Sequence, residues 1–126
     1  MRRIVVAVIM LMSIIITIVV GNYVVKNQCN NFKKEIYTIS NLIERKNGDN
    51  AYKAVINSKE KWHRKKAIIS IFSNHAPLDE ITVSMDELAA ATRIKDIEKA
   101  LIVSARISAH IDRITEEQRI HVESFF

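Results

Sequence analysis

Residues 4–25 form a nearly unbroken apolar run, flanked by Arg2 and Arg3 on one side and by Lys26 on the other. A helix rises about 1.5 Å per residue, so about 20 apolar residues cross the hydrocarbon core of a bilayer, which is about 30 Å thick. The run holds no Asp, Glu, Lys, Arg or His side chain, so it lacks the usual signs of an ion path or proton relay. It predicts an N-terminal transmembrane anchor over residues 1–26, in contact with lipid through residues 4–25, and a separate domain over residues 27–126.

A cleaved secretory signal is the alternative interpretation of this run. Signal peptides have a shorter apolar region, about 7 to 15 residues, and end at small residues in an A-x-A-like pattern. The nearest approach to that pattern is Val19-Val20-Gly21, and Cys29 follows Lys-Asn-Gln rather than the apolar and small residues that precede a lipidated cysteine. A retained single-pass anchor is therefore preferred.

The orientation of the anchor rests on the positive charges near its two ends. Arg2, Arg3 and the terminal amine are nearly balanced by Lys26, Lys33 and Lys34. A short N-terminal flank before a large C-terminal domain is typical of a signal-anchor, which places the amino terminus inside the cell and the domain outside the cytoplasm. The near balance of charge also allows the reverse orientation.

The domain is predicted to be all-α, with the transmembrane helix continuing into an antiparallel four-helix bundle. Only two Gly and one Pro occur in the chain, which favours long helices with few turns. Apolar residues at alternating steps of four and three form one helical stripe. This stripe is Val25, Cys29, Phe32, Ile36, Ile39 and Ile43. The stripe begins inside the anchor, so the first helix is expected to leave the membrane without a break. It is expected to end at residues 47–50, because Gly and Asn accommodate a left-handed backbone and Asn or Asp can cap the next helix.

Three further helices follow from the same periodicity. The second is predicted over residues 51–73 and the third from Pro77 to about Ala91, with a later start at the capping box of Ser84 as the alternative. The fourth begins after Asp96 as its cap. The predicted inner residues are Tyr52, Val55, Ile56, Trp62, Ile69 and Phe72 in the second, Leu78, Ile81, Met85 and Leu88 in the third, and Ile97, Ala100, Leu101, Ser104, Ile107, Ile111 and Ile114 in the fourth.

Charge is divided unevenly within the domain. Residues 27–66 hold ten basic and four acidic groups, whereas residues 67–126 hold six and ten, giving net charges of +6 and −4. These halves could pack on each other, or the basic half could face anionic lipid headgroups. Because three of the five net positive charges of the chain belong to the anchor, the composition does not predict a nucleic-acid partner.

The most basic segment, residues 59–66, supplies most of the candidate interaction residues. They are Lys59, Lys61, Trp62, His63, Arg64, Lys65 and Lys66. The segment could bind anionic lipid or an acidic partner, in which case reversing the charges of Lys65 and Lys66 weakens liposome binding. The simpler interpretation is an exposed helix face around one buried tryptophan, with lysine stems along the edge of the core. His75 with Asp79, one turn apart, and the apolar end with Phe125 and Phe126 are the remaining candidates.

The segment W-x6-I-x-I-F-x-N-H-x-x-L-D-E-I-x-x-S-x-x-E-L, residues 62–88, resembles a known family. It is similar to the short, single-anchored, uncharacterised membrane proteins of spore-forming Gram-positive bacteria, which are grouped as a domain of unknown function. The family-like positions are Trp62, His75, Leu78, Asp79, Ile81, Ser84 and Leu88. The resemblance implies one anchor, a helical domain outside the cytoplasm and a membrane-protein partner, and it implies no activity or cofactor. Ala76-Pro77 departs from the more acidic residues expected there.

No arrangement of residues predicts an enzyme, a cofactor or a metal site. A nucleophile and its base must converge on a pocket, yet Cys29 lies on a core stripe and the four histidines are scattered. Cys29 is expected to be a packed, reduced thiol, with an intermolecular disulfide as the alternative. We therefore predict a structural or adaptor protein that binds another membrane protein. A ligand-binding or sensory bundle is the alternative, and self-association stays open.

Overall fold

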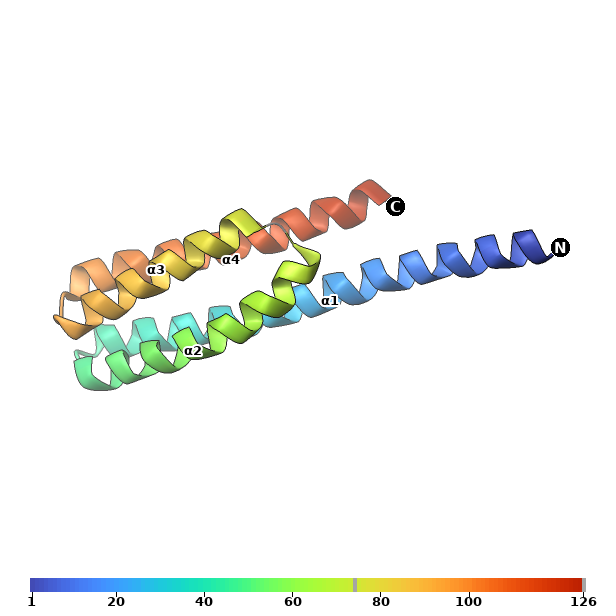
Figure 1. The fold of residues 1–126 in the computed structure, drawn as a ribbon. Helices are drawn as coiled ribbons and strands as arrows, with labels where there is room; N and C mark the ends of the chain where they lie inside the picture. The colour runs from blue at the N-terminus through green and yellow to red at the C-terminus, as the bar shows by residue number, and fades with distance from the viewer. Residues whose placement is uncertain (74, 126) are drawn as a thin grey trace.

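The computed structural model describes the backbone of residues 1–73 and 75–125, and the side chains of these residues except 121, 122, 124 and 125. The chain forms four helices in this part, α1 (Arg2–Glu44), α2 (Gly48–Phe72), α3 (His75–Arg93) and α4 (Ile97–Phe125), and the described residues contain no strand. Each helix packs against two others, α1 on α2 and α4, and α3 on α2 and α4. The result is the predicted antiparallel four-helix bundle, with α1 extending far beyond it (Figure 1).

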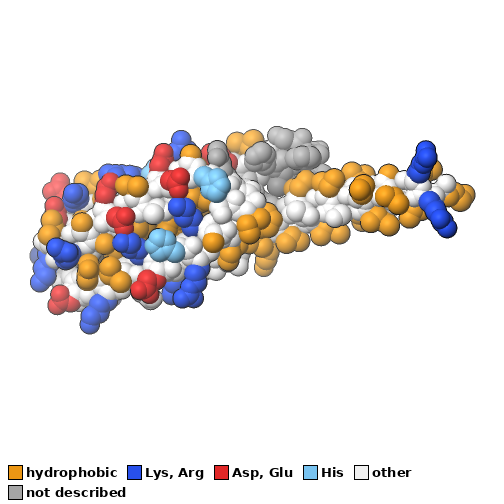
Figure 2. Space-filling model, viewed as in Figure 1, with side chains coloured by type: hydrophobic (Ala, Val, Ile, Leu, Met, Phe, Trp, Pro, Cys, Tyr) orange, Lys and Arg blue, Asp and Glu red, His pale blue; other side chains and the backbone are white. Residues whose placement is uncertain are grey.

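The anchor and the bundle share one helix. No residue of α1 before Gly21 is buried, whereas the predicted stripe from Val25 to Ile43 is buried throughout. Figure 2 shows hydrophobic side chains covering the part of α1 that projects from the bundle. This is the one helix among the described residues that is long and apolar enough to cross a membrane. Because α1 passes through residue 26 without interruption, the domain boundary placed there stays a prediction.

Most of the predicted inner residues form the core. Fully buried side chains come from all four helices, as expected from three-four spacing. The largest are Trp62, Phe32, Ile36, Ile39, Ile69, Leu78, Ile81, Met85, Leu88, Ile107, Ile111 and Ile114. The prediction is wrong for Ile97, which is 39% exposed, because it is the first residue of α4 and lies at the open end of the bundle.

The α1–α2 and α3–α4 connections have the same backbone geometry. Lys46 and Lys95 adopt left-handed φ angles of 60° and 61°. In the first connection the Lys46 N–H donates to the Ile43 carbonyl and the Asn47 N–H to the Leu42 carbonyl, which is the Schellman pattern. The expectation that Gly48 or an Asn would take the left-handed conformation is therefore wrong, because α1 ends early enough to place a lysine there.

The two connections cap the next helix differently. Asp96 accepts a hydrogen bond from the Lys99 N–H at 3.2 Å through Oδ1, as predicted for a cap. Asn47 occupies the corresponding position before α2, but its side chain makes no capping hydrogen bond. With Asn47 in this position, α2 begins at Gly48, three residues before the expected start.

We expect Lys46→Gly to stabilise the protein by about 0.5 to 1 kcal/mol. A left-handed residue with a Cβ costs about 1 to 2 kcal/mol, part of which is offset by the greater freedom of glycine in the unfolded chain. Urea unfolding of the full chain in detergent micelles, followed by circular dichroism, measures the change. The control is Lys53→Gly, the same substitution inside α2, which should destabilise by about 1 kcal/mol. Destabilisation by both would contradict the role given to the Lys46 backbone.

The α2–α3 connection packs against the base of the anchor. A Cβ atom on Gly21 would lie only 2.6 Å from Cδ1 of Phe72, so the absence of a side chain lets this ring lie directly on α1. Gln118 of α4 donates from Nε2 to the Phe72 carbonyl at 2.8 Å and satisfies the end of α2. Since α3 begins at His75, Ser84 is buried inside it and the alternative start there is wrong.

Candidate functional site

The basic segment of α2 surrounds a tryptophan that is 1% exposed. Trp62 stacks on Phe32 of α1, with ring centroids 4.8 Å apart and an interplanar angle of 26°. Its Nε1–H donates to Oγ1 of Thr82 in α3 at 2.9 Å, and that hydroxyl donates in turn to the Leu78 carbonyl at 3.1 Å. Trp62 therefore connects α2 to α1 and α3 from within the core and is not a surface residue.

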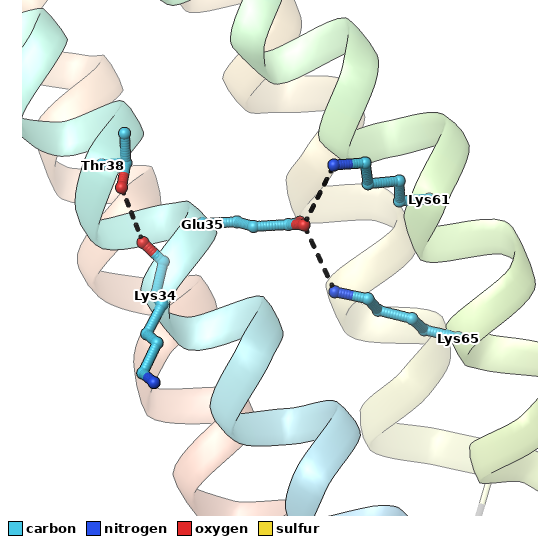
Figure 3. Close-up of polar contacts among 5 residues, drawn as sticks. All are labelled: Lys34, Glu35, Thr38, Lys61 and Lys65. Carbon is cyan, nitrogen blue, oxygen red and sulfur yellow. Dashed lines mark hydrogen bonds and ion pairs between the residues drawn. The ribbon is translucent and has the colours of Figure 1, made fainter.

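Two lysines of the segment converge on one carboxylate of α1. Figure 3 shows Glu35 reaching between Lys61 and Lys65, and both ammonium groups lie 3.5 Å from its Oε1. The Lys65 side chain is 13% exposed, and its Nζ lies 5.4 Å from the centre of the Phe32 ring, a cation–π contact. The other oxygen of Glu35, Oε2, is buried without a hydrogen bond. This cluster fastens α1 to α2 beside the Phe32–Trp62 stack.

Two other lysines of the segment bind carboxylates of α3. Lys59 lies 2.5 Å from Asp86, and Lys66 lies 2.9 Å from Asp79. The hydrogen bond from Lys66, together with its charge, lowers the pKa of Asp79 below its usual value. His63 and Arg64 are exposed on the same helix, and His75 is exposed at the start of α3.

These pairs explain the uneven division of charge along the sequence. Lys59 and Lys66 join the basic half of the domain to the acidic half, and Lys33 joins α1 to Asp112 of α4 at 2.6 Å. Of the two arrangements left open by the sequence, packing of the halves on each other is the one that the structure contains. Lipid or partner binding by the segment stays a prediction, and reversing Lys65 and Lys66 would also break ion pairs inside the bundle.

We expect Glu35→Ala to destabilise the protein by about 1.5 to 3 kcal/mol, because it leaves the largely buried ammonium group of Lys65 without its carboxylate. The matched control is Glu87→Ala, which removes the more exposed pair with Arg106 and should cost less than about 1 kcal/mol. Urea unfolding of both variants measures the difference. Equal effects would mean that the Glu35 cluster is only a solvated surface pair.

Cys29 is buried on the inner stripe of α1. Loss of hydration raises the pKa of its thiol to about 11, although a hydrogen bond with Thr115 opposes the change. Because the thiolate is the reactive form, we expect maleimide to label Cys29 in the folded chain at pH 8 at least about a hundredfold more slowly than an exposed cysteine. Cys29→Ala carrying Tyr37→Cys supplies that exposed thiol. Comparable rates would show that Cys29 is open to solvent and available for a disulfide.

A shallow groove between α3 and α4 contains a histidine–carboxylate pair. Nδ1 of His110 lies 3.1 Å from Oε2 of Glu80, which also binds Arg113 at 3.3 Å. The groove is lined by Asp79, Glu80, Val83, Ser84, Glu87, Arg106 and His110. Within the described residues, no three His, Cys, Asp or Glu side chains are grouped so as to hold a metal ion.

Another pocket lies at the end of the bundle far from the anchor, which we call the distal tip and define as residues 43–51 and 91–100. Its volume is about 210 Å³. Its apolar floor includes Ile43, Ala51 and Ala100, and its rim includes both left-handed lysines, Lys46 and Lys95. Sequence reasoning did not find this pocket, because it depends on the way the two loops meet. Ile94, 68% exposed, extends from the same end.

The C-terminal candidates are only partly described. The backbone of Phe125 ends α4, but its side chain and all of Phe126 lie outside the described residues. The partner role predicted for this end therefore stays a prediction.

Comparison with known proteins places the chain in a domain-of-unknown-function family, as the resemblance in residues 62–88 implied. A model of the domain-of-unknown-function family DUF4363 matches residues 19–124, which include nearly all of the bundle and the last part of the apolar run. No curated protein and no solved structure matched the chain significantly. Because the match covers most of the chain, this protein belongs to the DUF4363 family.

Proposed function

We propose that this protein is a membrane-anchored adaptor, a helical bundle held directly on the outer surface of the cell membrane that binds another membrane protein. The observation that carries the proposal is the continuity of α1, which is an exposed apolar rod over residues 4–20 and a core helix of the bundle from Val25 onward. A helix that is apolar on all sides is stable in lipid and not in water. A bundle built on such a helix has a fixed height and direction above the membrane.

The filled interior supports an adaptor over a sensor. Trp62 and Ile107, which would line a central ligand cavity, are fully buried against other side chains. The distal pocket, at about 210 Å³, is smaller than the usual range of ligand sites, about 300 to 1,000 Å³. The groove between α3 and α4 reaches about 380 Å³, but it is shallow and open to solvent. The bundle is therefore suited to present a surface rather than to enclose a molecule.

The distal tip is the surface that we assign to the partner. The part of α1 from Gly21 to Glu44 rises about 36 Å at 1.5 Å per residue, so the tip stands far from the bilayer. It combines the exposed Ile94 with a pocket that has an apolar floor and a rim of both charges. Apolar groups within a polar rim are typical of protein interfaces. Asp49 and Asp96 also line this pocket, so an apolar side chain flanked by polar groups on the partner would match it.

Photocrosslinking in intact cells tests the proposal. A photoreactive amino acid at Ile94 should capture one membrane protein reproducibly, and Ile97→Asp in the same chain should abolish the adduct by charging the pocket rim. The same probe at Tyr37, which is 69% exposed on the side of α1, is the matched control and should give little of that adduct. Recovery of lipid alone, or of a second copy of this chain, would contradict the adaptor role.

A ligand-binding bundle is the second candidate, and the distal pocket is the observation that favours it. Thr92 at its wall is 5% exposed, and its rim pairs Lys46 and Lys95 with Asp49 and Asp96, which suits a small molecule carrying both charges above the apolar floor. Lys46→Gly with Lys95→Gly would then abolish a ligand-induced rise in melting temperature. Persistence of that rise would place any ligand elsewhere.

A further inference from the structure

The end of the bundle that faces the anchor carries apolar residues of its own. Ile71 of α2 is 73% exposed, and Ile68, one turn earlier on the same face, is 38% exposed. Figure 2 shows the hydrophobic surface of the anchor continuing onto the end of the bundle. Exposed apolar groups next to a membrane-spanning segment are stable if lipid, rather than water, surrounds them.

The height of this surface relative to the anchor is fixed by two contacts. The Phe72 ring lies on Gly21, so the end of α2 stands level with residue 21 of α1. Gln118 binds the Phe72 carbonyl, so α4 reaches the same level and continues through Phe125, about 10 Å farther toward the anchor. Figure 1 shows this end of α4 extending past the α2–α3 connection.

The length of the exposed apolar part of α1 indicates where the boundary of the hydrocarbon core lies. Residues 4–20 rise about 25 Å, which is less than the hydrocarbon thickness of about 30 Å. The boundary of the hydrocarbon therefore falls at or beyond Gly21, the level of Phe72. Lys66 and Lys59 lie about 9 and 20 Å farther out along α2, at the height of the headgroups and above them.

One carbonyl group at the end of α2 is bound by a side chain rather than left to water. The last carbonyl groups of a helix have no partner within it and must otherwise bind water or a side chain. Here the side-chain amide of Gln118 donates a hydrogen bond to the Phe72 carbonyl. Gln118 is 7% exposed. On the side of α1 facing α4, Lys26 and Arg119 line a small polar pocket with Asn22. Arg119 forms ion pairs with Glu116 and Glu123 of α4, so these charges are partly neutralised at the membrane-proximal end.

We propose that the membrane-proximal end of the bundle is inserted in the interfacial layer of the bilayer, with Ile68 and Ile71 of α2 in contact with lipid chains. The occupant of this surface is lipid, and the proposal rests on the membrane anchoring proposed above. The bundle then sits in the membrane surface at two places, α1 and the end of α2, which restrains it from tilting.

Spin-label accessibility in the full chain tests this insertion. A nitroxide is attached at single cysteines in a Cys29→Ala background, reconstituted in phosphatidylcholine–phosphatidylglycerol vesicles. The positions are Ile71→Cys, the equally exposed Ile94→Cys at the distal tip, and Leu11→Cys in the anchor. The ratio of collisions with oxygen to collisions with a water-soluble nickel chelate rises with depth in the membrane. Emission from Trp62, the one tryptophan in the chain, checks that each variant is folded.

The ratio of oxygen to nickel collisions is expected to be highest at Leu11 and several-fold lower at Ile94. At Ile71 it should lie well above the value at Ile94. A ratio at Ile71 equal to that at Ile94, with Leu11 still high, would overturn the insertion and leave the anchor intact. A low ratio at Leu11 would overturn both the anchor and the insertion.

Discussion

Trp62→Ala should destabilise the protein by about 3 to 5 kcal/mol, the largest effect of a single core substitution. The indole packs on Phe32 of α1 and donates to Thr82 of α3, so its removal leaves a cavity where three helices meet. A domain of this size has a free energy of unfolding of about 5 to 15 kcal/mol in total, so the substitution removes a large part of that stability. Urea unfolding of the full chain in detergent, followed by circular dichroism, measures the loss.

Two control variants separate packing from hydrogen bonding at this site. Trp62→Phe keeps a ring against Phe32 and loses the Nε1 donor, but the Thr82 hydroxyl still binds the Leu78 carbonyl, so the cost should be about 1 to 2 kcal/mol. Tyr37→Ala, at an exposed aromatic residue of α1, should change stability by less than about 0.5 kcal/mol. A Trp62→Ala effect no larger than that of Tyr37→Ala would contradict the central position of Trp62.

The second large effect concerns the anchor. Replacing both Leu11 and Ile14 by arginine should release the protein from the membrane. An arginine near the centre of a span costs about 2.5 to 3.5 kcal/mol, whereas leucine and isoleucine favour insertion by a few tenths, so the pair of substitutions disfavours insertion by about 6 to 8 kcal/mol. Membranes washed with alkaline carbonate should lose the variant and retain the natural chain.

A charge at the edge of the span is the matched control for this variant. Ile4→Arg adds its charge beside Arg2 and Arg3, where the side chain can reach the headgroups, and should leave the protein in the membrane. Retention of the Leu11 and Ile14 double variant after the carbonate wash would mean that the apolar run does not cross the bilayer.

Helical periodicity was enough to predict the elements of this fold. The stripe from Val25 to Ile43 shows that the first helix leaves the apolar run without a break, and Pro77 marks the start of α3 within two residues. Both predictions depend only on local spacing and backbone preference. Local preference also misled at the first loop, where Gly48 and the asparagines suggested the left-handed position that Lys46 takes.

The contacts between helices could not be predicted in the same way. The sequence showed that the domain has a basic and an acidic half, but pairing Lys66 with Asp79 and Lys61 with Glu35 requires the order and rotation of the helices around the bundle. The same is true of Phe72 on Gly21 and of the distal pocket, which form where residues distant in sequence meet. Tertiary geometry therefore supplied the two surfaces on which the proposed functions depend.

Alkaline extraction of membranes from cells that make this protein, followed by intact mass measurement, tests whether residues 4–25 hold the bundle on the bilayer. We expect the chain in the extracted membrane pellet, at a mass that still includes residues 1–26. Recovery in the soluble fraction, at a mass that lacks this leading segment, would contradict a tethered bundle.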